Sequence, residues 1–325
     1  MKLLCVDVGG TSVKHAIIES GTIITEKGNY TPDGSSLEAY IESLGQLADR
    51  YIDKVDGVTF SMPGIIDPQS GYFYTGGAYD KIVHEVNLKE LLEKRIGKPI
   101  CVENDAKAAG YAELGYGALK NVKDGIIITL GHAVGGCLVF NREVVHGKHF
   151  SAGELSFVNT DYHEPDFPAS LGCRCGADSL RERVQEKLGS DEKLSGHEIF
   201  ALANEGNEKV LEAIHEFAME LCIQLYNLQI IFDPELFALG GGISAQKLLF
   251  EQIEDCFAEM KSKMRFFIHK PQVVPCAFGN DANMIGAYHN FQLYYQGRNI
   301  IEQRGKIKVI KKVRIKDDPE RKGFI

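Results

Sequence analysis

Short apolar runs alternate with amphipathic segments along most of this chain of 325 residues. Buried strands are predicted by the apolar runs 3–6, 16–18, 57–60, 100–102, 126–130, 137–141 and 237–239. Apolar residues at helical spacing, or runs of strong helix formers, predict helices at 36–51, 88–95, 106–114, 207–231 and 282–295. Strands that alternate with helices, each group opened by a hairpin, predict an α/β protein with mixed sheets.

The order of these segments predicts two α/β lobes with a cleft between them, because single cores stop growing near ~250–300 residues. We expect an N-terminal lobe of residues 1–117 and a C-terminal lobe of residues 118–281. The helix at 282–296 is expected to pack back on the first lobe. Residues 297–325 are expected to form a basic C-terminal extension, for which a basic strand or a solvated extension is favoured over a nucleic-acid patch.

The bulk composition excludes several classes of protein. The formal net charge of −9 argues against a nucleic-acid partner. No run approaches the ~20 apolar residues of a membrane span, so no membrane partner is expected. The chain starts with a strand instead of a signal peptide, and its eight cysteines are spread over the predicted elements. These features predict a reduced, cytoplasmic protein.

The turn after the first strand carries the first candidate chemistry. Gly9 and Gly10 occupy the tight turn of a predicted hairpin, where their N–H groups can face an anion. Thr11 adds a hydroxyl, Lys14 a positive charge, and Asp7 a carboxylate that could orient Mg²⁺ through water. The pattern favours a phosphate site, with an ordinary hairpin turn as the alternative.

Two further glycine-rich turns follow predicted strands, at 131–136 and at 240–242. Together, the three turns predict a nucleotide held between the lobes. The predicted nucleotide contacts beyond the first turn are Thr129, Gly131, His132, Gly240, Gly241 and Gly242.

A polar segment, Glu103-Asn104-Asp105-Ala106, lies between these turns at a predicted strand-to-helix junction. At a helix N-terminus the dipole favours the ionised form of Asp105. The alternative is that Asn104 or Asp105 only caps the helix, a common role for both residue types.

Five motifs resemble the ROK family of sugar kinases and repressors. They are Asp7-Val8-Gly9-Gly10-Thr11, Glu103-Asn104-Asp105-Ala106, Ala152-Gly153-Glu154-Leu155, Asp233-Pro234 and Leu239-Gly240-Gly241-Gly242-Ile243-Ser244. The resemblance runs from residue 3 to about residue 290. It implies the two-lobed actin-like (ribonuclease H-like) ATPase fold with a central cleft.

The resemblance also implies an activity: ATP-dependent phosphorylation of a sugar hydroxyl, most simply O6 of a hexose or a β-glucoside, with Mg²⁺ and ATP. Asp105 matches the general base of the family, and Asn104 and Glu154 match residues that hold other sugar hydroxyls. Ser61, Gly64 and Gly77 match loops that line the sugar site. Relatives are often homodimers, so a homodimer is expected.

The chain departs from the family near the end of the sugar that carries the anomeric carbon. Phe157 stands where many members have a zinc-binding histidine, and Cys173 and Cys175 fall out of register with the zinc cysteines. We therefore expect no structural zinc. Gly172 replaces a second sugar-binding glutamate. The loss of two polar groups predicts a substrate substituted at that end, with a free hexose or N-acetylmannosamine as the alternative.

His132 replaces a threonine that contacts phosphate in the family, and its ring could donate instead. A repressor is not expected, because the phosphate motif starts at residue 7 and leaves no room before it for a DNA-binding domain. A catalytically weak sugar sensor is the remaining alternative. Such a sensor would be expected to lose Asp105 or the first glycine turn, and both are present.

Overall fold

The computed structural model of the protein describes residues 1–10, 12–161, 163 and 165–306, with side chains as far as residue 296. Residues 1–291 form one compact unit, which contains two mixed sheets and both sets of covering helices. Residues 292–325 form a second unit.

The first sheet has the strand order β3-β2-β1-β5-β9, and β4 also pairs with β2. Its strands are β1 (Lys2–Val8), β2 (Val13–Glu19), β3 (Thr22–Ile23), β4 (Gly28–Tyr30), β5 (Gly57–Met62) and β9 (Ile100–Asn104). β1 and β2 form the predicted antiparallel hairpin, while β5 and β9 run parallel to β1. Every residue of β5 and β9 is buried, because these strands are covered on both faces.

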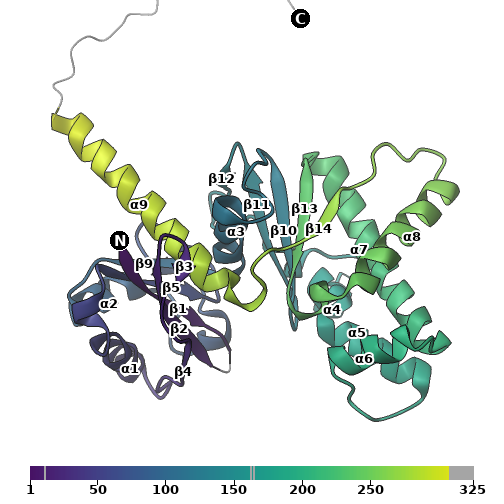
Figure 1. The fold of residues 1–325 in the computed structure, drawn as a ribbon, viewed down its shortest axis with the longest axis horizontal. Coiled ribbons are helices and arrows are strands. Elements are labelled where there is room, and N and C mark those ends of the chain that lie inside the picture. The colour runs from purple at the N-terminus through teal and green to yellow at the C-terminus, as the bar shows by residue number, and fades with distance from the viewer. Residues whose placement is uncertain (11, 162, 164, 307–325) are drawn as a thin grey trace, which may run out of the picture. The chain divides into compact units, whose positions relative to one another are not determined.

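Helices α1 (Leu37–Asp49) and α2 (Leu88–Ile96) pack on one face of the first sheet (Figure 1). Tyr40, Leu44 and Leu92 enter its core from these helices. Ser36 caps α1 by accepting a hydrogen bond from Ala39 N at 3.1 Å, which explains the start of that helix. A small sheet of β6 (Ile66–Asp67), β7 (Tyr72–Phe73) and β8 (Val86–Asn87) lies between β5 and α2 in sequence.

The second sheet repeats the plan of the first, with the order β12-β11-β10-β13-β14. Its strands are β10 (Gly125–Leu130), β11 (Val134–Phe140), β12 (Glu143–Val144), β13 (Leu236–Gly240) and β14 (Val273–Pro275). A hairpin again comes first, and β13 lies parallel to β10. The predicted turn at 131–136 is shorter than expected, because pairing resumes at Val134.

The two faces of the second sheet are covered by different helices. Ile126 and Ile128 of β10 face a core shared with α4 (Leu171–Cys175), α5 (Ala177–Leu188), α6 (Gly196–Asn204), α7 (Glu208–Phe232) and α8 (Lys247–Lys263). Ile127 faces the other way and packs with Leu114 of α3 (Asp105–Tyr116). Helix α3 therefore starts at the end of β9 in the first sheet and covers a face of the second.

Helix α9 (Ala282–Lys306) is longer than the predicted helix at 282–295. Within the first unit, the Ala287 carbonyl accepts a hydrogen bond from Thr59 Oγ1 of β5 at 3.1 Å. The helix continues past residue 296, because the next ten residues contain no proline and mostly helix-forming side chains. The rest of the predicted basic strand, 307–316, lies outside the described residues. In the described part of the chain, no helix is long and apolar enough to cross a membrane.

Candidate functional site

A cavity of about 770 Å³ lies where strands of both sheets end. Asp7 lines it from the end of β1, Asn104 from β9, Thr129 from β10 and Gly240 from β13. These are the carboxyl ends of strands that run parallel within each sheet, where α/β proteins place their ligand sites. The volume is typical of a pocket for small molecules.

Most of the predicted site residues line this cavity. The predicted residues that line it are Asp7, Lys14, Gly64, Gly77, Asn104, Asp105, Thr129, Gly131, His132, Glu154, Gly240 and Gly241. Ser61, Gly9, Gly10 and Gly242 are not among its lining residues in the described part of the chain. Thr11 lies outside the described residues. The structure thus gathers two sequence-distant groups of predicted residues around one cavity.

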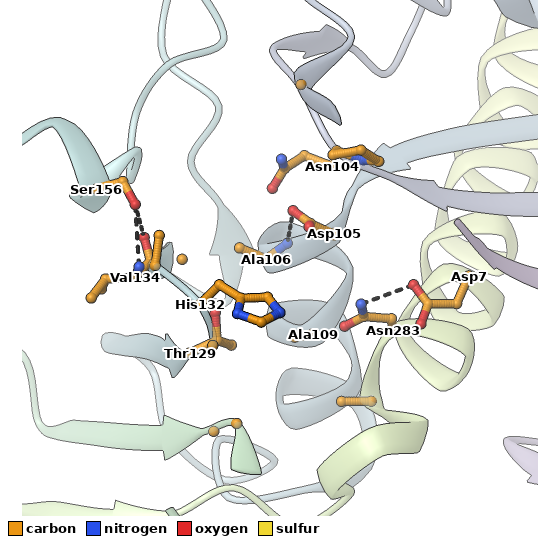
Figure 2. A pocket seen from close by; sticks show the side chains of 18 of the residues that line it. Asp7, Asn104, Asp105, Ala106, Ala109, Thr129, His132, Val134, Ser156 and Asn283 are labelled. Carbon is orange, nitrogen blue, oxygen red and sulfur yellow. Dashed lines mark hydrogen bonds between the residues drawn. The ribbon is translucent and has the colours of Figure 1, made fainter. Parts of the chain in front are cut away.

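Asp105 is the first residue of α3, and its side chain is partly buried in the cavity wall (Figure 2). Its Oδ1 accepts a hydrogen bond from Ala106 N at 2.8 Å. Burial raises the pKa of Asp105 from its usual 3.8 to about 6. The Ala106 hydrogen bond lowers this pKa, the nearby carboxylates of Asp7 and Glu154 raise it, and Lys107 lowers it. A pKa of this size suits a group that accepts a proton near neutral pH.

Asn104 has the capping role that was the alternative for this motif. Its Oδ1 accepts a hydrogen bond from Lys107 N at 3.1 Å, and its Nδ2 donates to the Gly64 carbonyl at 3.0 Å. One N–H of the amide group stays available to the cavity. Asn104 therefore fixes the start of α3, and with it the direction of Asp105, while it also lines the site.

Lys107 is a site residue that the sequence analysis missed. Its side chain is only 1% exposed, and its Nζ donates to Glu154 Oε1 at 3.0 Å. A buried lysine is tolerated when it is paired, and here it holds one carboxylate oxygen of Glu154 in place. A lysine among the small residues of the 106–114 helix was the sequence signal for a specific partner.

Asp7 is held by side chains from two other elements. Its Oδ1 accepts hydrogen bonds from Asn283 Nδ2 of α9 at 3.0 Å and from Ser61 Oγ of β5 at 3.2 Å. Burial raises the pKa of Asp7, while Asn283, Lys14 and Ser61 lower it. Ser61 is completely buried, so in this structure it supports Asp7 and does not face the cavity. Asn283, which Figure 2 shows beside Asp7, was also missed by the sequence analysis.

A magnesium ion fits the donor set at Asp7. Mg²⁺ in phosphate-binding sites is commonly held by one or two carboxylates, by substrate phosphates and by water. Asp7 supplies one carboxylate whose Oδ1 is already fixed, and Lys14 on the cavity wall adds a charge suited to phosphate. No group of three or more His, Cys, Asp or Glu residues in the described ranges could hold a metal by itself.

The second sheet presents small residues to the cavity. Gly241 has a φ of 94°, and a Cβ atom added there would lie 2.2 Å from the Leu130 carbonyl oxygen. Only glycine fits this close approach, which lets the turn after β13 pack against the end of β10 at the cavity. Thr129 and Gly131 line the same side from the end of β10.

His132 extends from the turn between β10 and β11, and its side chain is 88% exposed. Its Nδ1 lies 3.1 Å from Asp178 Oδ2 of α5. Asp178 is also bonded to Arg181. The predicted phosphate donor thus lines the cavity while its ring is paired with Asp178.

The positions that depart from the zinc-bearing pattern lie in two places, beside Glu154 and in α4. Phe157 is exposed at the cavity edge, in a 3₁₀ turn (Leu155–Phe157) that follows Glu154. Cys173 and Cys175 lie in α4 as free thiols, and burial raises the pKa of Cys175 to about 12. A neutral thiol is a poor zinc ligand. The expected lack of structural zinc stays a prediction.

The comparisons with known proteins identify the family. The family model "ROK family" matches residues 3–292. The chain belongs to the ROK family. This result confirms the resemblance predicted from the five sequence motifs.

Several similar proteins are named as sugar kinases. The chain is 31% identical to the β-glucoside kinase of Listeria monocytogenes over 90% of this chain and 97% of that protein. It is 27% identical to an N-acetylmannosamine kinase of Haemophilus influenzae over 88% of this chain and 94% of that protein. The crystal structure of a ROK glucokinase from Streptomyces griseus, in complex with glucose and AMPPNP, matches with a TM-score of 0.73 and 24% identity, covering 88% and 98% of the two chains.

These comparisons confirm two predictions about this ROK protein. The fold is the two-lobed actin-like fold, in agreement with the repeated plan of its two sheets. The enzyme class is that of the sugar kinases.

Proposed function

We propose that this protein transfers the γ-phosphoryl group of ATP to O6 of a hexose or β-glucoside, with Asp105 as the general base. The observation that carries the proposal is the position of Asp105 at the start of α3, in a cavity lined by both sheets. Its raised pKa and the available Oδ2 fit proton transfer from a sugar hydroxyl. Named relatives that phosphorylate sugars support this reaction class.

In the proposed reaction, the sugar lies against the first sheet. Asp105 accepts the proton of the O6 hydroxyl as that oxygen bonds to the γ-phosphorus and the bond to ADP breaks. Glu154, held by Lys107, and the remaining amide N–H of Asn104 bind other hydroxyls of the ring. Positioning of this kind supplies most of the catalysis in phosphoryl transfer.

The nucleotide is proposed to lie against the second sheet. Gly131, Gly240 and Gly241 leave room for its phosphates, and Lys14 reaches the cavity from the first sheet. Asp7 would hold Mg²⁺ through water, and the metal would offset negative charge on the phosphates. The glucokinase from Streptomyces griseus, which shares this fold, was crystallised with both glucose and an ATP analogue, and this supports a site for two substrates.

A β-glucoside is the favoured acceptor, because the relative at 31% identity is a β-glucoside kinase. The replacements Phe157 and Gly172 support a substituted anomeric carbon. N-acetylmannosamine is the second candidate, favoured by the relative at 27% identity.

The test is ADP release with Mg²⁺-ATP and a panel of sugars: glucose, mannose, N-acetylmannosamine, N-acetylglucosamine, cellobiose and gentiobiose. We expect turnover with a β-glucoside, and ³¹P and ¹³C spectra of the product that place the phosphate on C6. Turnover only with N-acetylmannosamine would select the second candidate. Sugar binding without any turnover would instead indicate a weak sensor.

We also propose a homodimer, formed through an exposed apolar patch of Val158, Ile230, Ile231 and Phe232. The patch borders a groove of about 650 Å³ beside the end of α7. Exposed apolar surface of this kind favours association. The mass of the intact protein by light scattering should be that of a dimer, and Ile231→Asp should give a monomer. We further propose that the protein is located in the cytoplasm.

A further inference from the structure

Two phenylalanine rings are exposed at the edge of the cavity. Phe157 is 67% exposed and Phe167 is 57% exposed, and both line the cavity. Their ring centroids are 6.4 Å apart, with 49° between the ring planes. Exposed apolar surface inside a ligand pocket marks a place where an apolar face of the ligand binds.

The segment that carries these rings is tied together at its base. Asn159 and Ser170 form a β-bridge, and Thr160 N donates to the Ala169 carbonyl at 2.8 Å. Leu171 N donates to the Val158 carbonyl, also at 2.8 Å. These bonds hold the 3₁₀ turns Leu155–Phe157 and Phe167–Ala169 side by side, so the ring pair belongs to one connected structure.

The ring pair directly follows the polar part of the proposed sugar site. Phe157 N donates to the Glu154 carbonyl at 3.2 Å, within the turn that also presents the Glu154 carboxylate. Behind this turn, a Cβ atom at Gly172 would lie 2.7 Å from Ser156 Oγ, so no larger polar side chain fits there. A ligand that contacts Glu154 with hydroxyls therefore meets an aromatic wall next to it.

We infer that Phe157 and Phe167 bind the ring attached to the anomeric oxygen of a β-glucoside, either a second sugar or an aryl group. The inference rests on the proposed kinase function and adds a selectivity to it. Sugar rings and aryl groups both have a flat apolar face, and aromatic side chains bind such faces by stacking and by burial of area. The aromatic wall contributes to the binding of a β-glucoside and contributes nothing to the binding of free glucose.

The first experiment compares kcat/KM for cellobiose, phenyl β-glucoside and glucose in the protein and in Phe157→Ala/Phe167→Ala. We expect the double variant to lose about tenfold on the two glucosides, and less than about twofold on glucose. Phe266→Ala is the matched control, because Phe266 is 72% exposed and does not line the cavity. Equal losses on all three substrates, or no loss on the glucosides, would overturn the inference.

A second experiment does not depend on turnover. The chain contains no tryptophan, so Phe157→Trp gives a single tryptophan, which is excited selectively over the tyrosines and keeps an aromatic ring at the wall. We expect cellobiose and phenyl β-glucoside to change its emission, and glucose to leave it unchanged. A fluorescence response to the glucosides without ADP release would support the proposed role of the two rings and overturn the proposed kinase activity. ADP release without a fluorescence response to any glucoside would support the kinase activity and overturn the proposed role of the rings.

Discussion

The two sheets share one plan but bring different residues to the cavity. In each, an antiparallel hairpin is followed by strands parallel to its first strand, in the orders β3-β2-β1-β5-β9 and β12-β11-β10-β13-β14. The first sheet ends in the carboxylates of Asp7 and Asp105. The corresponding ends of the second carry Thr129 and the glycines at 240–241.

This difference separates two requirements of a phosphoryl transfer site. Charged groups must be fixed by neighbours, as Asn283 and Ser61 fix Asp7 and as Lys107 fixes Glu154. Phosphates need space and backbone N–H groups, which glycine provides without a side chain. A common backbone plan therefore supports two kinds of site, because the strand ends carry different residue types.

The strongest test of the first sheet is Asp105→Asn. The amide cannot accept the hydroxyl proton, so we expect kcat to fall by about 10²–10⁴-fold. Burial raises the pKa of Asp105, so its charge destabilises the folded protein at neutral pH. The variant should therefore unfold at the same or a higher temperature, with an unfolding free energy that is larger by up to about 3 kcal/mol. Steady-state kinetics measures kcat and calorimetry measures the stability. An unchanged kcat would show that Asp105 is not the general base.

The strongest test of the second sheet is Gly241→Ala. A Cβ atom there would collide with the Leu130 carbonyl oxygen at 2.2 Å, and the φ of 94° is strained for alanine. We expect a loss of about 1–3 kcal/mol in unfolding free energy and an increase of about tenfold in the KM for ATP. Gly242→Ala is the control, because a Cβ atom there would meet nothing within 4 Å. Equal effects of the two substitutions would contradict a special role for position 241.

The support of the charged groups is tested by Lys107→Met. Glu154 would lose its partner, and the pKa of Asp105, which Lys107 lowers, would rise further. We expect kcat/KM for the sugar to fall by about tenfold, and the acid side of the pH profile to move to higher pH. Lys89→Met serves as control, because Lys89 is also buried but its Nζ donates to the Gln69 carbonyl and not to a residue of the cavity. An unshifted profile would indicate that Lys107 only stabilises the fold.

The pH dependence of the unmodified enzyme should follow Asp105. Its pKa is about 6 in the folded protein, so the base is protonated at lower pH. We expect kcat/KM to be constant above about pH 7 and to fall to about a tenth of that value at pH 5. Because the folded protein binds this proton more tightly than the unfolded chain, the same group adds stability below about pH 4. That contribution is lost as the pH rises through 6. A profile that stays flat to pH 5 would exclude this base.

The sequence was sufficient to predict the parts of the fold with strong local signals. The hairpins, the all-apolar strands and the long amphipathic helix α7 (Glu208–Phe232) are confirmed. Helix α6 (Gly196–Asn204) was missed, although Ser195 and Glu198 form a capping box. Helix α8 (Lys247–Lys263) was also missed, although its apolar residues recur at helical spacing.

The site was less predictable than the fold where it depends on long-range partners. The glycine turns and the Asp105 junction have local patterns that can be read from the sequence. The contacts of Asn283 with Asp7 and of Lys107 with Glu154 join residues 276 and 47 positions apart. Nothing in the local sequence around Asn283 indicates such a partner. Ser61 shows the same limit, because only the structure places its hydroxyl on Asp7.

The smallest expected effect comes from His132→Ala, the one predicted phosphate contact whose ring is almost fully exposed. The pair of His132 with Asp178 lies in solvent, where water and salt weaken such interactions. We expect the KM for ATP to change by less than about twofold, with kcat unchanged. His84→Ala is the matched control, because His84 forms a similar exposed pair with Asp80 and does not line the cavity. An increase of tenfold or more in the KM for ATP, absent in the control, would show that His132 turns from Asp178 to a phosphate when the nucleotide binds. The second sheet would then supply charge as well as space, and the contrast between the two sheets would be weaker than the structure indicates.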